Sequence, residues 1–137
     1  MNPSKHKISV LTQIFKLIPG NLISKLAVKH GVDKQARSFS PTSHVASLLF
    51  GQLSHALGLN DICDTLRNHN GVLTTIRKST PPSRNGFSYA NRTRNADMAE
   101  ELFWTTLKHL EDICPNFRTG TTLLRDTQTF QANNTRC

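Results

Sequence analysis

The sequence predicts an all-α fold, a small multi-helix domain, and three observations support this prediction. Apolar residues recur at spacings of three and four along most of the chain, which places them on one face of a helix. Proline, glycine and asparagine residues interrupt the pattern at intervals that suit helix ends. The 137 residues suffice for one domain with its own core and are too few for two large ones.

The first two helices have recognisable ends. Apolar residues at helical spacing in 8–18 predict a first helix, which Pro19 and Gly20 end. Asn21 suits the N-cap of a second helix, and Gly31 suits the left-handed position after its C-terminus.

The next two helices form the middle of the chain. Thr42 or Ser43 can cap a third helix. We expect this helix to be the central element of the core because of its apolar residues, which are Val45, Leu48, Leu49, Leu53 and Ala56. After a tight break, Asn60 is expected to cap a fourth helix that ends at 68–71. We expect a loop to follow, with an extended piece at 73–76.

Two further helices and a tail complete the prediction. The Pro-Pro-Ser sequence at 81–83 predicts the start of a fifth helix, which runs to about Arg94. Gly86 lowers the stability of this helix by about 1 kcal/mol relative to alanine, so packing against the rest of the fold must stabilise the helix. A last helix is expected from 95 or 96 to 114. Residues 118–137 are rich in Thr, Asn and Gln, and we interpret them as an irregular, disordered tail after a domain of 1–117.

Several classes of protein are disfavoured by what the chain lacks. No stretch of 18 apolar residues occurs, so no segment is expected to span a membrane. The cysteines at 63, 114 and 137 form no CxxC pair, and no histidine has a Cys or carboxylate cluster at ligand spacing. We therefore predict no metal and no cofactor. The Ser-His pairs have no carboxylate to orient them, so no catalytic residue is assigned.

The basic charge of the chain is unevenly distributed. Lys and Arg outnumber Asp and Glu by 17 to 9, which gives a net charge of +8. Residues 65–96 hold six basic residues and no acidic one, whereas 97–113 hold five acidic residues and one lysine. Such a basic segment favours a polyanionic partner, and double-stranded DNA is the partner we predict. A solvated basic face without a partner is the plainer interpretation.

The fifth helix carries the groups that a DNA-reading helix needs. Arginine can bind guanine with two hydrogen bonds, and asparagine can do the same for adenine. The residues expected to contact base edges are Arg84, Asn85, Ser88, Asn91 and Arg92. Those expected to contact phosphates are Arg77, Lys78 and Arg94. Together with the helix before it, this helix predicts a helix-turn-helix-like DNA-binding unit. Tyr89 and Trp104 are too few and too far apart to stack bases, and we expect them to pack against the core.

A family resemblance covers about residues 7–117. It rests on five sequence segments in order, which are LTQIFKLIP at 11–19, ARSFS at 36–40, LLFGQLS at 48–54, GLNDICDTL at 58–66 and RNGFSYANR at 84–92. These segments resemble the N-terminal domain of insertion-sequence-4 family transposases, which belong to the DDE class. The resemblance implies a helical module that recognises the terminal inverted repeats of a transposon. Residues 8–18 have an amphipathic pattern rather than that of a signal peptide, so we expect a cytoplasmic, nucleoid-associated protein. We also expect it to form a homo-oligomer or to associate with intact transposase.

The resemblance further implies a ribonuclease-H-like catalytic domain after this module, in which three acidic residues hold two divalent metals. Asp126 is the single acidic residue after Asp112, and its surroundings do not match the expected catalytic strand. We therefore expect DNA binding without strand transfer, so the chain itself is not expected to be an enzyme. A frameshift near residue 118 would account for the tail. Two alternatives stay open, which are a small helical regulatory protein with an acidic partner and a non-functional transposase remnant.

Overall fold

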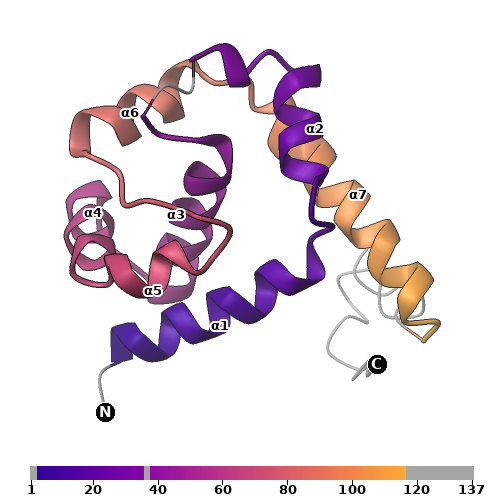
Figure 1. Cartoon of the computed structure of the whole chain (residues 1–137), viewed down its shortest axis with the longest axis horizontal. Helices are drawn as coiled ribbons and strands as arrows, with labels where there is room; N and C mark the ends of the chain where they lie inside the picture. Colours follow the sequence, from indigo (N-terminus) through magenta and orange to yellow (C-terminus); the bar gives the residue numbers. More distant parts are fainter. Residues whose placement is uncertain (1–2, 36–37, 117–137) are drawn as a thin grey trace.

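The computed structural model describes residues 3–35 and 38–116, and every element of regular secondary structure within those ranges is a helix (Figure 1). The α-helices are α1 (Pro3–Leu17), α2 (Leu22–Lys29), α3 (Pro41–Ser54), α4 (Leu59–Asn68), α5 (Asn70–Thr74), α6 (Arg84–Thr93) and α7 (Asp97–Ile113), with a 3-10 turn at Asp33–Gln35. The predicted all-α class is confirmed. The predicted tail at 118–137 lies outside the described residues.

Helix α3 is the centre of the fold. It packs against α1, α2 and α4, and α4 in turn packs against α6. Figure 1 shows α4, α5 and α6 on one side of the molecule and α2 and α7 side by side on the other. One continuous core joins these groups, and its most deeply buried large residues are Ile8, Leu11, Ile23, Phe50, Leu66, Leu73 and Phe87.

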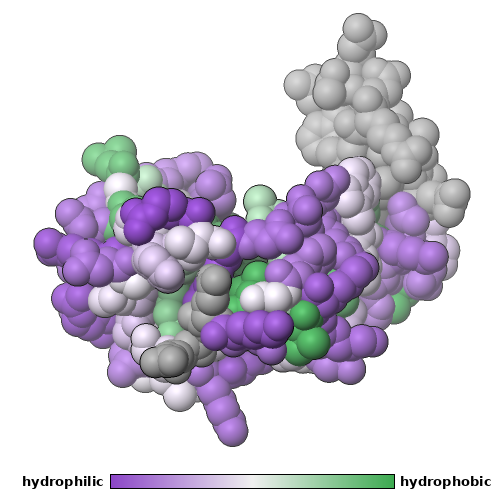
Figure 2. Space-filling model, turned by 90° about the horizontal axis from the view of Figure 1, so that it is seen from above, coloured by the Kyte–Doolittle hydropathy of each residue, from purple (hydrophilic) through white to green (hydrophobic). Residues whose placement is uncertain are grey.

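On the face seen in Figure 2, hydrophilic residues cover most of the surface. Seen from above, hydrophobic atoms come to the surface in small separate patches (Figure 2). No helix within 3–35 or 38–116 is long and apolar enough to cross a membrane.

Two predicted helix caps, those of α3 and α4, lie two or three residues after the observed ones. Helix α3 begins at Pro41, and Ser40 is its N-cap, with its hydroxyl accepting the N–H of Ser43 at 3.0 Å. Proline suits the first helical position because it has no N–H to leave unpaired, so the cap moves one residue before it. Helix α4 begins at Leu59 after Gly58, which leaves Asn60 inside the first turn.

The extended piece predicted at 73–76 is wrong. Residues 70–74 form the short helix α5, and turns follow it. Leu73 and Ile76 are both buried, which a helical turn achieves because residues three apart share a face. The threonine hydroxyls of Thr74 and Thr75 donate to carbonyls three or four residues back, which stabilises the turns.

Most other boundaries lie close to the predicted ones, but α1 begins at Pro3, before the predicted segment 8–18. Asn21 precedes α2 as predicted, although its side chain makes no cap hydrogen bond. Gly31 has φ +71 directly after α2, so it occupies the left-handed position that favours glycine. Ser83 caps α6, and α7 begins at Asp97. Lys29 and His30 bind Glu101 at 2.6 Å and 2.7 Å, which links α2 to α7 and holds the pKa of that carboxyl below its ordinary value.

Arg77 stabilises the C-terminal end of α1. Its guanidinium donates to the carbonyl oxygens of Phe15, at 2.6 Å, and of Ile18, and it lies 5.4 Å from the centre of the Phe15 ring. The last carbonyls of a helix have no partner within it, so a cation there satisfies them and interacts favourably with the helix dipole.

Arg77→Ala is therefore expected to lower the free energy of unfolding by about 2 kcal/mol, since charged hydrogen bonds to partly buried carbonyls are lost. Lys78→Ala is the matched control, because Lys78 is the next residue, is exposed and also has a positive φ. Urea unfolding followed by circular dichroism measures both. Equal losses in the two variants would contradict the role given to Arg77.

Candidate nucleic-acid interface

Helix α6 is fixed to the rest of the fold by its cap and by two buried residues. The hydroxyl of Ser83 accepts the N–H of Gly86 at 3.0 Å. A Cβ on residue 86 would lie 2.8 Å from that hydroxyl, so glycine leaves room for the cap. Phe87 and Ala90 are buried, and the Phe87 ring packs edge-on against Phe39 with 5.8 Å between centroids. The opposite side of α6 consequently faces solvent in a fixed orientation.

The exposed side of α6 carries a row of polar and aromatic side chains. Ser88 and Tyr89 are three and four residues after Asn85, and Arg92 is four and three residues after them, so all four share this side. Together with Gly86 they line a shallow depression. The Arg92 guanidinium lies 5.6 Å from the centre of the Tyr89 ring, within the range of a cation–π contact. The structure thus brings together Asn85, Ser88 and Arg92, three of the five residues predicted to contact base edges.

Tyr89 belongs to this row, although the sequence analysis places it in the core. Its side chain is 52% exposed. The signal was present in the sequence, because Tyr89 is four residues after Asn85 and three before Arg92 and so shares their face.

Arg84 lies at the N-terminal end of the same helix and faces α4. Its guanidinium is 3.9 Å from Oδ2 of Asp64. The other carboxylate oxygen, Oδ1, lies 3.4 Å from the guanidinium of Arg67. All three side chains are at least half exposed, so this group is a solvated cluster with one excess positive charge. Arg67 was not among the predicted site residues.

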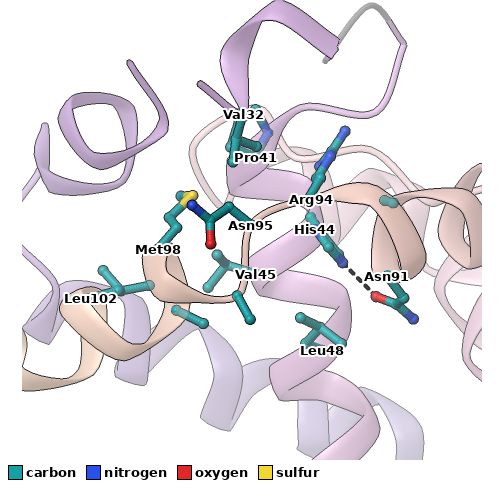
Figure 3. Close-up of a pocket in the computed structure, with 13 residues that line it drawn as sticks. Val32, Pro41, His44, Val45, Leu48, Asn91, Arg94, Asn95, Met98 and Leu102 are labelled. Carbon is teal, nitrogen blue, oxygen red and sulfur yellow. Dashed lines mark hydrogen bonds between the residues drawn. The ribbon is translucent and has the colours of Figure 1, made fainter. Parts of the chain in front are cut away.

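Asn91 points toward α3 rather than into the exposed row. Figure 3 shows its amide oxygen bonded to the imidazole of His44, and the Nε2–Oδ1 distance is 2.6 Å. Burial lowers the pKa of His44, which favours the neutral imidazole, and its Nε2–H then donates to the Asn91 oxygen. Asn91 is exposed, but its amide oxygen already accepts from His44 and is turned toward α3, which leaves it poorly oriented for a two-bond contact with adenine.

Arg94 and Arg77 bind backbone carbonyls within the fold. The Arg94 guanidinium donates to the carbonyl of Phe39 and lies 5.3 Å from the Phe39 ring centre, and burial lowers its pKa. Arg77 binds the end of α1 as described above. Of the three residues expected at phosphates, Lys78 alone has an exposed side chain.

A small apolar pocket adjoins this region between α3, α6 and α7 (Figure 3). Its volume is about 180 Å³, and its walls include Val45, Leu48, Met98 and Leu102. Within the described ranges, no group of three or more His, Cys, Asp or Glu side chains lies close enough together to hold a metal ion.

The comparisons with known proteins give one match. A family model described as a domain of unknown function, DUF4372, matches residues 6–76, which span α1 to α5. This domain is found in transposase-like proteins. No curated protein and no solved structure matches the chain.

Proposed function

The chain belongs to the DUF4372 family, and from this premise we propose that it is the DNA-binding module of an insertion-sequence-4 type transposase. Its partner is double-stranded DNA that carries the terminal inverted repeats of the transposon. The exposed side of α6 is the surface that meets the DNA. Two features support the proposal, which are the occurrence of the domain in transposase-like proteins and the chemistry of α6.

The observation that carries the proposal is the composition of the exposed row on α6. It presents an amide, a hydroxyl, a phenol and a guanidinium on one side of a ten-residue helix. No acidic residue occurs between 65 and 96, so no carboxylate on this helix repels a polyanion. Such a helix is about 15 Å long, and a major groove about 12 Å wide admits it.

The proposed contacts fall into two classes. We assign Asn85, Ser88 and Arg92 to base edges, and the Arg92 guanidinium lies over the Tyr89 ring. We assign Arg84 and Arg67, which flank this row, to phosphates, and we keep the exposed Lys78 as a further candidate for a phosphate contact. We leave Arg77 and Arg94 out of the contact set because backbone carbonyls already bind their guanidinium groups.

Salt dependence tests this proposal directly. If three phosphates are neutralised, log affinity should fall against log salt with a slope of about −3, so a fourfold rise in salt weakens binding by roughly 60-fold. Fluorescence anisotropy of a labelled duplex measures the slope. A duplex with the inverted repeats that flank the gene should bind more tightly than a scrambled duplex of equal length.

Two results would overturn the proposal. One is binding that does not change with salt. The other is displacement of the duplex by polyglutamate at equal charge concentration, which would favour an acidic protein partner. Arg92→Ala should weaken binding but leave the slope unchanged, because Arg92 is assigned to a base edge, and a slope reduced by about 1 would instead assign it to a phosphate.

A further inference from the structure

An arginine lies against an aromatic ring at three places among the described residues. At two of them, Arg77 lies against Phe15 and Arg94 against Phe39, and both rings are buried. The guanidinium groups of these two arginines donate to backbone carbonyls, and Arg77 binds two carbonyl oxygens at once. In the interior of the fold, a ring therefore holds an arginine whose donors already have oxygen partners.

The third pair, Arg92 and Tyr89, lies at the surface of α6. Both residues are exposed, and the guanidinium is 5.6 Å from the ring centre. Contact with a ring face uses none of the five N–H donors of an arginine. The Arg92 guanidinium makes no hydrogen bond or ion pair with another described residue. Among the three ring-held arginines, it is therefore the one whose donors remain free for a ligand.

Other exposed aromatic residues do not hold a cation in this way. Trp104 was expected in the core, and the structure places it at the surface of α7, where it is 49% exposed. Its ring contacts that of Phe103, with 5.0 Å between centroids, rather than a basic side chain. The pairing of an exposed ring with a free guanidinium is thus a property of α6.

The surroundings of Arg92 favour a base edge over a phosphate. The other side chains that line the depression, those of Asn85, Ser88 and Tyr89, are uncharged. Arg84, the next cation on the helix, faces Asp64 on α4 instead. The depression therefore offers one two-pronged donor among neutral polar groups, which suits an uncharged ligand with two neighbouring acceptors.

Guanine is the base that meets this requirement. In the major groove it presents two acceptors, O6 and N7, to which an arginine can donate two hydrogen bonds. Adenine and cytosine each present an amino group there, which is a donor like the guanidinium itself, and thymine presents a single acceptor beside its methyl group. Only guanine satisfies both prongs of the fork.

We infer that Tyr89 is a positioning residue, which holds the Arg92 guanidinium in place to donate two hydrogen bonds to one guanine of the DNA site. This inference rests on the proposed function, and it adds the identity of one base and the residue that orients its reader. The arginine side chain is long and has many rotamers. Contact with the ring restricts them, so less conformational entropy is lost when the hydrogen bonds form.

Single-base variants of the inverted-repeat duplex test the contact with guanine. For the unaltered chain, one guanine position should stand out, where any other base weakens binding by about tenfold or more. At that position 7-deazaguanine, which keeps the base pair but lacks the N7 acceptor, should weaken binding by about fivefold. Arg92→Ala should bind all these duplexes equally, because the reader of that position is gone. Fluorescence anisotropy at one salt concentration measures each affinity.

Two variants at position 89 test the positioning role. Tyr89→Phe keeps the ring and should keep the preference for guanine. Tyr89→Leu removes the ring and should reduce that preference by about threefold. Asn85→Ala is the matched control on the same row, and it should weaken binding while leaving the preference at this position unchanged. Circular dichroism checks that each variant keeps its helices.

The possible failures are distinguishable. Salt-dependent binding of the duplex without a guanine preference that Arg92→Ala removes would sink this inference and leave the proposed function standing. An unchanged preference in Tyr89→Leu would show that Tyr89 does not position Arg92. A chain that binds no duplex at all would contradict the proposed function itself.

Discussion

Reversing the charge of Arg84 and Arg92 together should weaken binding to duplex DNA by about a hundredfold or more. Each exposed arginine that contacts a base edge or a phosphate is worth about 1–3 kcal/mol, and an acidic replacement adds repulsion from the polyanion. Arg84→Glu also places a second carboxylate near Asp64, whose oxygen lies 3.9 Å from the present guanidinium. Anisotropy titrations at one fixed salt concentration measure the loss.

The matched control for this variant is the pair Lys16→Glu and Lys25→Glu. Both lysines are exposed, they lie on α1 and α2, and the double change alters the net charge by the same amount. We expect this control to weaken binding far less, since these residues are not on α6. Equal losses in the two double variants would mean that net charge, rather than the face of α6, governs binding.

Phe87→Ala should lower the free energy of unfolding by about 3–5 kcal/mol, because it removes a large, fully buried side chain and leaves a cavity. The Phe87 ring contacts those of Phe39 and His44, so the loss also loosens the attachment of α6 to the N-terminal end of α3. A loss of this size is a large part of the 5–15 kcal/mol that stabilises an ordinary domain. Urea unfolding measures it.

Tyr89→Ala provides the control for Phe87→Ala on the same helix. Tyr89 is 52% exposed, so its removal should cost less than about 1 kcal/mol of stability. It should nevertheless reduce the affinity for DNA, because the Arg92 guanidinium loses the ring that supports it. If the two aromatic variants were equally unstable, the orientation of α6 described here would be wrong.

The helices were predictable from the sequence where local signals decide them. The apolar spacing of α1 and the glycine at position 31 depend on a few neighbouring residues, and both predictions are confirmed. The errors occur where two local signals compete. At α3, Pro41 displaces the cap to Ser40, and at 73–76 the β-branched residues suggest a strand although Leu73 and Ile76 share a helical face.

The candidate site was predictable in position but not in every member. The helix that carries it and its cap at Ser83 follow from the sequence Pro-Pro-Ser. The direction in which each arginine side chain points cannot be predicted from the sequence, because it depends on which backbone carbonyls the other helices leave unpaired. Arg77 donates to a carbonyl at the end of α1, and Arg94 donates to the carbonyl of Phe39. Both partners are more than fifty positions away in the chain.

The sequence by itself determined that the chain is helical, that its basic charge is concentrated before residue 97, and that α6 carries amides and arginines. These properties follow from residue type and spacing, which act over one or two helical turns. The tertiary structure alone decided which of those arginines remain available to a partner, that Tyr89 and Trp104 face solvent, and that His44 binds Asn91. Those outcomes depend on contacts between distant helices, since packing buries one side of each helix and leaves the other to bind.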